Sequence, residues 1–174
     1  MKILENKNIL IGVTGSIAAY KSADLVSMLK KEGCNVKVVM TKSSQGFVTK
    51  TTFEALTGNV VSIDNEETKA NYEHLDLSKW ADIMIIAPCT ANVMNKISNG
   101  LGDDLLTTTC LAFNKKLFLA PAMNPEMWDN NVTQANLKKL ENGNINVVGP
   151  EYGEHACGDT GYGRMSKPEK ILEK

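Results

Sequence analysis

Residues 8–40, NILIGVTGSIAAYKSADLVSMLKKEGCNVKVVM, decide the fold of this chain. Residues 8–14 form a short apolar run, which predicts a strand buried on both faces. In residues 17–32 the apolar side chains recur at helical spacing, and Gly33 stands where such a helix is expected to end. Residues 35–40 predict a second strand. The segment is therefore a β–α–β unit, and crossovers of this kind are right-handed and join parallel strands.

Strands and helices alternate along the rest of the chain as well. Further strands are predicted at residues 60–63, 82–87, 117–120 and 145–148. Further helices are predicted at residues 43–57 (two short helices broken near Thr51), 91–98, 103–113, 131–142 and 168–173. No change of composition marks a second domain. The sequence therefore predicts one α/β domain over residues 1–174, Rossmann-like or flavodoxin-like, with a parallel sheet of five or six strands and helices on both faces.

Composition excludes several classes of function. The 174 residues carry 19 Lys and Arg against 20 Asp and Glu, and binding to nucleic acid needs a surplus of positive charge. No apolar run is long enough to span a membrane, and the charged start MKILENKN does not resemble a signal peptide, so a cytoplasmic location is expected. Two histidines and four cysteines without CxxC or CxxH spacing predict no metal site. If the protein is an enzyme, a cofactor is expected to supply the difficult step.

The four cysteines fall into two groups. Cys34, Cys89 and Cys110 lie in apolar or helical contexts and are predicted to be small buried side chains. Cys157 lies instead in the Gly-rich, non-periodic stretch 149–167, which we expect to be a mobile clamp loop that closes over a substrate. Cys157 is therefore the cysteine that we expect to be functional.

Ligands in open parallel sheets bind outside the carboxyl ends of the strands. This rule selects residues 14–16, 41–43, 88–92 and 121–124. At the first segment Gly15 lets the chain turn, Ser16 can cap the next helix, and the helix N-terminus offers N–H groups to a phosphate. At the second, Thr41 and Ser43 supply hydroxyls but no acidic residue of the kind that holds the ribose of NAD. The site therefore favours one terminal phosphate, as in FMN.

Two further segments offer polar chemistry. Asn124 can present both a donor and an acceptor to a ligand, and the alternative is a helix N-cap followed by Pro125. His74 is the leading acid–base candidate, with His155 as its competitor. His155 and Cys157 also allow a Cys/His hydrolase, but neighbours two residues apart in a flexible loop rarely hold the geometry for proton transfer.

Five motifs occur in register. They are Gly-Ser-Ile-Ala-Ala-Tyr-Lys (15–21), Pro-x-Thr-Ala-Asn (88–92), Asn-Gly-x-x-Asp-Asp-Leu-Leu (99–106), Pro-Ala-Met-Asn-Pro-Glu-Met-Trp (121–128) and Ala-Cys-Gly-Asp-x-Gly-x-Gly-Arg-Met (156–165). Through them the whole chain resembles the homo-oligomeric flavin-containing cysteine decarboxylases. The resemblance implies FMN as cofactor and loss of CO2 from a cysteine carboxylate after its thiol is oxidised to a thioaldehyde.

The Ala-Cys-Gly segment distinguishes two branches of that family. It favours the members that convert 4'-phosphopantothenoylcysteine to 4'-phosphopantetheine in coenzyme A biosynthesis. The alternative is oxidative decarboxylation of the C-terminal cysteine of a lantibiotic-type precursor peptide. A flavin-binding regulatory subunit is a more distant alternative, disfavoured because the sequence shows no acidic tail and His74, Asn124 and Cys157 are all present. A flavin prenyltransferase is a further one, disfavoured by the Ala-Cys-Gly segment.

The resemblance also implies roles for individual residues. His74 matches an essential histidine near the flavin, Asn124 matches the residue that holds the substrate carboxylate, and Cys157 matches the residue needed for the final reduction, as proton donor. Contacts to FMN are implied at Gly15, Ser16, Ile17, Thr41, Phe47, Thr90, Ala91, Asn92 and Ala122. Contacts to substrate are implied at Asn124, Met127, Ala156, Cys157, Gly158 and Arg164. Cys89 stands where many members carry Ala, so a thiol is expected near the flavin.

The family assembles as trimers, in some members as a dodecamer of four trimers, with FMN near a subunit interface. The resemblance therefore implies an oligomer in which His74 acts on a flavin bound by a neighbour. It also implies a small-molecule substrate and a phosphopantothenoylcysteine synthetase, either fused to this chain or separate. It leaves open whether the chain is a standalone enzyme or the N-terminal part of a bifunctional protein.

Overall fold

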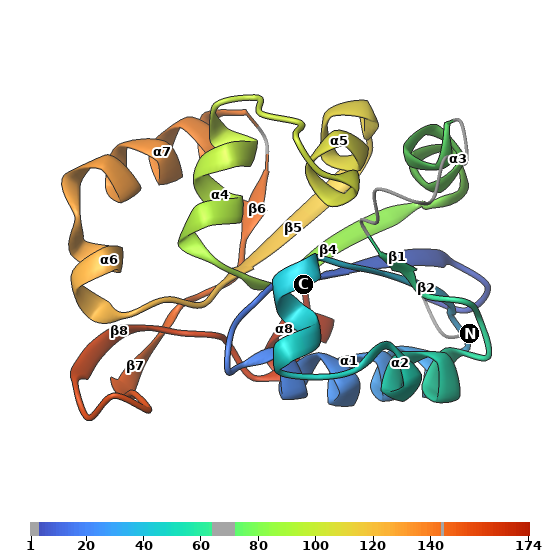
Figure 1. Ribbon diagram of the computed structural model, residues 1–174, viewed down its shortest axis with the longest axis horizontal. Coiled ribbons are helices and arrows are strands. Elements are labelled where there is room, and N and C mark those ends of the chain that lie inside the picture. The colour runs from blue at the N-terminus through green and yellow to red at the C-terminus, as the bar shows by residue number, and fades with distance from the viewer. Residues whose placement is uncertain (1–3, 64–71, 144) are drawn as a thin grey trace.

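One parallel sheet organises the computed structural model, which describes residues 4–63, 72–143 and 145–174. Over these residues the sheet has six strands in the order β3-β2-β1-β4-β5-β6, and every pairing is parallel (Figure 1). The strands are β1 (Asn8–Val13), β2 (Asn35–Met40), β3 (Ser62–Ile63), β4 (Ile83–Cys89), β5 (Lys116–Pro121) and β6 (Asn146–Val147). The predicted fold class is therefore confirmed.

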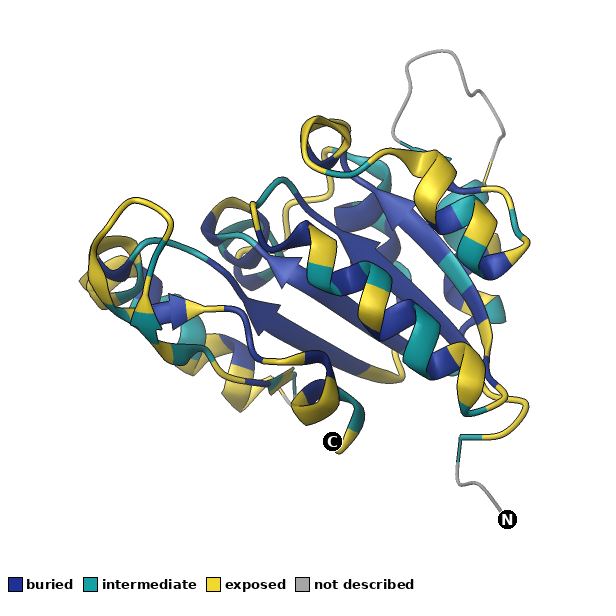
Figure 2. Cartoon of the chain, turned by 90° about the horizontal axis from the view of Figure 1, so that it is seen from below, coloured by how far each residue is buried: buried dark blue, intermediate teal, exposed yellow. Residues whose placement is uncertain are grey.

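Helices cover both faces of this sheet. One face packs against α1 (Ala19–Lys31), α2 (Lys50–Thr57) and α8 (Pro168–Leu172). The other face packs against α3 (Glu73–Trp80), α4 (Ala91–Ser98), α5 (Leu105–Ala112) and α7 (Asn131–Asn142). Side chains alternate along a strand, so Ile9 and Ile11 of β1 enter the first core while Leu10 enters the second. In Figure 2 the strands are buried along most of their length, and the helices in front are exposed on their outer side.

The opening β–α–β unit forms as predicted. Strand β1 pairs with β2 from Asn8 opposite Asn35 to Val13 opposite Met40. Gly33, directly after the helix cap, has a φ of +85°, which glycine adopts without a Cβ penalty. The helix itself begins two residues later than expected, because the Ser16 hydroxyl accepts the Ala18 N–H at 3.2 Å before the first helical residue. The prediction that Ser16 caps the helix is therefore wrong, since the cap position is Ala18.

Smaller boundaries also differ from the predictions. The break within residues 43–57 falls at 47–49, between the 3-10 helix η1 (Lys42–Gly46) and α2, and not near Thr51. Strands β4 and β5 extend through the prolines expected to end them, because the Ala122 N–H continues the ladder onto the Cys89 carbonyl at 2.9 Å. Helix α5 begins at Leu105, where Asp104 forms a capping box with Thr107.

The largest difference lies in residues 149–167, which were expected to be a clamp loop without regular structure. They contain an antiparallel pair, β7 (Glu151–Glu154) and β8 (Thr160–Arg164), which we call the β7–β8 hairpin. Tyr152 pairs with Tyr162, their ring centroids lying 5.4 Å apart. The next pair is Gly153 opposite Gly161. Glycines occupy alternate positions in these strands, so apolar side chains do not recur at every second residue. The sequence pattern therefore did not predict them.

The acidic loop expected at residues 64–73 lies mostly outside the described residues. Its last residue, Glu73, is the first residue of α3 (Glu73–Trp80), a helix that was not predicted from the sequence. None of the helices in the described ranges has the length and apolar character that crossing a bilayer requires.

Candidate active site

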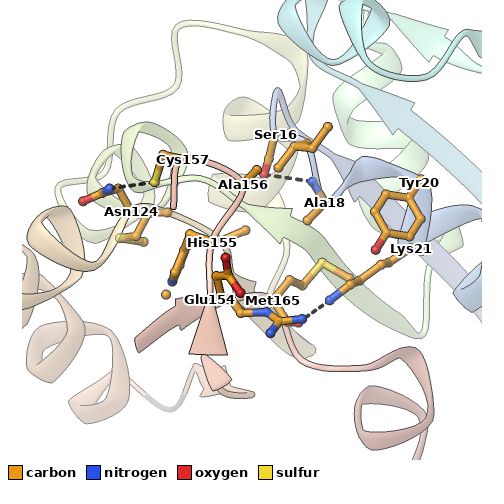
Figure 3. Close-up of a pocket in the computed structure, with 15 residues that line it drawn as sticks. Ser16, Ala18, Tyr20, Lys21, Asn124, Glu154, His155, Ala156, Cys157 and Met165 are labelled. Atoms are coloured by element: carbon orange, nitrogen blue, oxygen red, sulfur yellow. Dashed lines mark hydrogen bonds between the residues drawn. The ribbon is translucent and has the colours of Figure 1, made fainter. Parts of the chain in front are cut away.

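A cavity of about 390 Å³ lies where the ends of β1 and β5 meet the β7–β8 hairpin (Figure 3). Seven of the residues expected to bind cofactor or substrate line it: Ser16, Ile17, Ala122, Asn124, Ala156, Cys157 and Arg164. Eight further residues line it that were not predicted to contact cofactor or substrate, although His155 was the competing acid–base candidate: Ala18, Tyr20, Lys21, Met123, Glu154, His155, Gly163 and Met165. We call this the hairpin cavity.

A second cavity, of about 480 Å³, lies at the ends of β2 and β4. Three of the residues expected to contact the cofactor line it: Thr41, Thr90 and Asn92. Its other lining residues are Lys42, Ser43, Val93, Lys96, Asp103 and Asp104. We call this the hydroxyl cavity, because the Thr41 and Ser43 hydroxyl oxygens lie 3.1 Å apart at its edge.

Two acidic residues of the motif at 99–106 face the hydroxyl cavity. The Lys96 ammonium lies 2.7 Å from Asp103 Oδ1 and 3.3 Å from Asp104 Oδ2. The hydrogen bond to Asp103 is the main reason that the pKa of Lys96 is raised. The motif therefore supplies the two carboxylates that pair with Lys96 and the cap of α5, functions that its sequence alone did not indicate.

The turn at Gly15 and Ser16 connects the two cavities. A Cβ added at Gly15 would lie 2.5 Å from Ser43 Oγ, so this turn can approach the hydroxyl cavity only as glycine. The buried Thr14 beside it donates its hydroxyl to the Pro88 carbonyl at 2.7 Å and accepts the Thr90 N–H at 3.2 Å. The ends of β1 and β4 are therefore held together at the carboxyl edge of the sheet.

Asn124 is the helix N-cap that the sequence allowed, and its amide nitrogen stays free of that cap. As the N-cap of α6 (Pro125–Asp129), its Oδ1 accepts the Glu126 N–H at 2.8 Å. This bond sets the orientation of the amide and directs Nδ2 toward the hairpin, where it donates to Asp159 Oδ2 at 2.8 Å and to Cys157 Sγ at 3.5 Å. Figure 3 shows the contact with Cys157 at one end of the cavity. The cap therefore presents an amide donor beside a thiol.

Asp159 completes this cluster and was not among the predicted site residues. The Cys157 thiol donates to Asp159 Oδ2 at 3.2 Å, the same oxygen that accepts from Asn124. The hydrogen bond from Cys157, then that from Asn124, then the charge of His155, lower the pKa of the Asp159 carboxyl below its ordinary value. Its place in the motif at 156–165 is the signal that could have identified it.

His155 holds the hairpin together and does not face the thiol. Its N–H donates to the Asp159 carbonyl at 2.8 Å, and its Nε2 lies 3.3 Å from the Gly161 carbonyl oxygen. Since a carbonyl only accepts, Nε2 carries the proton in this contact. No described hydrogen bond joins His155 to Cys157, so the geometry does not support the Cys/His hydrolase.

Two cations line the far end of the hairpin cavity. Lys21 of α1 donates to the Met165 carbonyl at 2.9 Å, and Arg164 is the last residue of β8. Burial, and next the charge of Arg164, lower the pKa of Lys21. Neighbouring positive charges of this kind are stabilised by an anion, so this end of the cavity suits a negatively charged group.

His74 does not lie with Asn124 and Cys157. It sits half-buried in the first turn of α3, next to Glu73, whose carboxylate accepts the Ser62 hydroxyl at 2.6 Å. Figure 1 places α3 and the β7–β8 hairpin at opposite ends of the molecule. Within one chain the structure therefore separates the expected acid–base residue from the other two.

The remaining residues predicted to contact cofactor or substrate line neither of the two cavities. Phe47 and Met127 are each 49% exposed, Gly158 is exposed at the hairpin turn, and Ala91 is buried in the first turn of α4. Gly15 lies in the connecting turn already described.

The predicted burial of three cysteines is confirmed. Cys34, Cys89 and Cys110 are buried, and Cys157 is exposed. Burial raises the pKa of Cys89, and it raises the pKa of Cys110 to about 12, so these thiols stay protonated. In the described part of the chain no three His, Cys, Asp or Glu side chains are grouped so as to hold a metal ion.

Comparison with known sequences links this site to characterised proteins. The chain is 45% identical over 171 residues to the coenzyme A biosynthesis bifunctional protein CoaBC of Haemophilus influenzae, and the match covers 97% of this chain and 43% of that protein. It is 42% identical over 173 residues to CoaBC of Bacillus subtilis, covering 98% of this chain and 43% of that protein. The chain therefore spans less than half the length of these relatives.

Solved structures resemble the fold closely. A mutant PPC decarboxylase complexed with pantothenoylaminoethenethiol superposes with a TM-score of 0.84 at 33% identity, covering 97% of this chain and 96% of that one. The FMN-dependent cysteine decarboxylase SpaF has a TM-score of 0.83 at 29% identity, covering 97% and 95%. The model of the family described as Flavoprotein matches residues 2–174. With a match over nearly its whole length, the chain belongs to the Flavoprotein family.

Proposed function

We propose that this chain catalyses the FMN-dependent decarboxylation of 4'-phosphopantothenoylcysteine to 4'-phosphopantetheine in coenzyme A biosynthesis. The relatives named for that pathway and the similarity to a PPC decarboxylase support the proposal. The observation that carries it is the contact of the Asn124 amide with the Cys157 thiol, 3.5 Å apart, on a cavity that also contains Ser16, Ile17 and Ala122. A carboxylate-binding amide and a proton-donating thiol are the two groups that this chemistry requires beside a flavin.

The residues around the two cavities fit FMN. In the hydroxyl cavity Thr41, Ser43 and Asn92 provide polar groups that can hold the phosphate and ribityl chain. In the hairpin cavity Ile17 and Ala122 provide apolar surface for a flat ring, and Ile17 is 63% exposed. When bound there, FMN supplies the oxidation of the substrate thiol and the later return of the electrons.

The residues of the chain then have distinct tasks toward the substrate. The Asn124 Nδ2 group holds the carboxylate that leaves as CO2, while its Oδ1 stays fixed on the Glu126 N–H. The Cys157 thiol provides a proton to carbon in the last step. Lys21 and Arg164 provide positive charge for the phosphate of the substrate. Met127, Ala156 and Gly158 complete the substrate contacts, and the β7–β8 hairpin acts as the clamp.

His74 leads us to propose an oligomer. Since α3 lies at the opposite end of the molecule from the hairpin, we propose that His74 acts on FMN bound by a neighbouring subunit. Exposed apolar side chains on this chain, among them Tyr20 at 58% and Tyr72 at 66%, are suited to subunit contacts. We propose a trimer as the unit, alone or as four trimers in a dodecamer, which sedimentation velocity would distinguish.

The setting of the enzyme follows from the same proposal. We propose a cytoplasmic protein that acts with a phosphopantothenoylcysteine synthetase, fused or separate. The bifunctional relatives, of which the chain matches 43%, support the fused arrangement.

The test is release of CO2 from 4'-phosphopantothenoylcysteine by the FMN-loaded protein, compared with a peptide that ends in cysteine. We expect turnover of the small substrate and little or none of the peptide. Preferred turnover of the peptide would favour the lantibiotic-type alternative, and a protein that takes up no FMN would contradict both.

A Cys157→Ser variant tests the role of the thiol. We expect it to oxidise the substrate and release CO2 but to accumulate the oxidised intermediate in place of 4'-phosphopantetheine, measured by mass spectrometry. Cys34→Ser is the matched control, because that thiol is buried after the C-terminal end of α1 and donates to the Leu4 carbonyl. Normal product formation by Cys157→Ser would show that the assigned role is wrong.

A further inference from the structure

Among the described hydrogen bonds, one side chain links the hairpin tip, residues 155–160, to the protein outside the β7–β8 hairpin. The hydrogen bonds described within the hairpin run from His155 and Cys157 to Asp159, from Gly158 to His155, and from the His155 ring to the Gly161 carbonyl. The hairpin below it is anchored where the Met123 N–H donates to the Gly163 carbonyl at 2.9 Å. Among the described hydrogen bonds, those that reach outside the hairpin from the tip all come from Asn124.

The Asn124 amide has one group left for a ligand. Because Oδ1 is held by the Glu126 N–H, the Nδ2 hydrogens are the part of the side chain that faces the cavity. The shorter of their two contacts is to the Asp159 carboxylate, at 2.8 Å, against 3.5 Å to Cys157 Sγ. The Asp159 carboxylate therefore occupies the Asn124 Nδ2 donor, the group that the proposed function assigns to the carboxylate of the substrate.

We propose that Asp159 is a positioning residue that competes with the substrate carboxylate for the Asn124 amide. The inference rests on the proposed function, because it takes Asn124 as the binding group for that carboxylate. Asp159 is exposed, so it can turn toward solvent without losing buried contacts when another carboxylate takes its place. Two carboxylates at one amide repel each other, so binding of one excludes the other.

Displacement of Asp159 by the substrate carboxylate also changes the hydrogen bonding of the Cys157 thiol. The same Asp159 oxygen accepts from both Asn124 Nδ2 and Cys157 Sγ. When a substrate carboxylate displaces Asp159, the Cys157 thiol loses its acceptor and becomes available as a proton donor. After CO2 has left, the product carries no carboxylate, so Asp159 returns to the amide and the hairpin tip is attached again.

The kinetic test compares a ligand that carries the carboxylate with one that lacks it. In Asp159→Ala we expect the KM for 4'-phosphopantothenoylcysteine to fall about threefold to tenfold, the range for a charged hydrogen bond weakened by exposure. The inhibition constant of 4'-phosphopantetheine should change less than about twofold, because the product does not compete for the amide. A structural role of Asp159 would weaken both ligands together, and that result would overturn the inference.

Glu154→Gln is the matched control. Glu154 is an exposed carboxylate of the same hairpin and lines the same cavity, but no described hydrogen bond links it to Asn124. If the effect in Asp159→Ala came from charge alone, Glu154→Gln would lower the KM equally, which would contradict the competition. Asp159→Asn separates charge from shape, and we expect its KM to lie between those of Asp159→Ala and the unmodified enzyme.

A second readout is independent of the reaction. In the FMN-loaded protein without added substrate, we expect amide hydrogen exchange at His155 and Gly158 to be faster in Asp159→Ala, because the tip has lost its main attachment. Unchanged exchange would show that the contact does not hold the tip and would overturn the inference. Absence of CO2 release from the unmodified protein would instead refute the proposed function, so the two failures are distinguishable.

Discussion

Asn124 shows how one side chain can serve structure and chemistry at once. Its oxygen is used for the cap of α6, and this use fixes where its nitrogen points. A residue that made only one of these bonds would be free to rotate, and the donor would not be aimed at the hairpin. The residue after it, Pro125, lacks an N–H and so does not compete for the oxygen.

Replacing the donor while keeping the cap tests this division. In Asn124→Asp the remaining oxygen can still accept the Glu126 N–H, but the second oxygen repels Asp159 and any ligand carboxylate. We expect kcat/KM to fall by about a hundredfold or more, while the free energy of unfolding changes by about 1 kcal/mol or less.

Asn130→Asp is the control for that variant. Asn130 caps α7 with the same geometry, its side chain accepting the Val132 N–H at 2.9 Å, and it lines neither cavity. We expect both activity and stability to stay near those of the unmodified protein. A comparable loss of activity in Asn130→Asp would show that the effect of Asn124→Asp comes from capping.

At the scale of elements, the β7–β8 hairpin depends on close backbone approach. Gly163 of β8 has a φ of +138°, and a Cβ at this position would collide with the Met123 carbonyl. This approach brings Arg164 and Cys157 to the same cavity as the β5–α6 connection. The position of the β7–β8 hairpin therefore depends on glycine at position 163 of β8.

Gly163→Ala tests how the hairpin docks. We expect it to destabilise the protein by about 2 kcal/mol, through backbone strain and the clash with Met123, and to weaken substrate binding. Gly46→Ala is the control, since a Cβ there meets no atom within 4 Å. Chemical denaturation gives the stability of both variants, and equal effects at the two positions would contradict the docking argument.

An ion pair connects the hairpin to α8. Glu151 Oε1 lies 2.9 Å from Lys170 Nζ, and the hydrogen bond from Lys170 is the main reason that the pKa of Glu151 is lowered. Because the pKa of Glu151 is lower in the folded protein than its ordinary value of 4.5, this ion pair stabilises the fold at pH values above 4.5. The stabilisation is lost as the pH falls through the lowered pKa of the folded protein. Lys170 is exposed, so the contribution is small.

Lys170→Met tests that linkage. We expect it to lower the free energy of unfolding by about 0.5 kcal/mol at neutral pH and to have no effect at an acidic pH below the lowered pKa of Glu151, where that carboxyl is protonated. Urea titrations at the two pH values measure the difference. A loss of the same size at both values would mean that packing of the lysine stem, and not its charge, is responsible.

At the scale of the whole molecule, the separation of His74 from Cys157 requires an explanation. If each site takes His74 from a neighbour, a subunit lacking one residue can be complemented by a subunit lacking the other. We expect His74→Asn and Cys157→Ser, each inactive in product formation, to recover about a quarter of normal activity when mixed and reassembled at equal amounts. Recovery of no activity after subunit exchange would place both residues at the same chain's site.

The opening unit and the cysteines show what could be predicted from sequence. The β–α–β unit of residues 8–40 and the burial of Cys34, Cys89 and Cys110 follow from local composition and period, and the structure confirms them. The hairpin was missed because its glycines remove the period of two, and the start of α1 was misplaced because Ser16 accepts the Ala18 N–H, which precedes the first helical residue Ala19. Asp159 was missed because its importance depends on a contact across 35 positions of sequence.

The sequence by itself determined the fold class and family, because apolar periodicity and short motifs are local properties of the chain. It also marked the segments at the strand ends from which a ligand site is built. Only the tertiary structure decided which of those side chains meet: Asn124 with Asp159 and Cys157, and Lys21 with the end of β8. It also showed that His74 lies apart from them. The physical reason is that these contacts are made by residues distant in sequence, whose approach depends on how a sheet, a helix cap and a hairpin pack together.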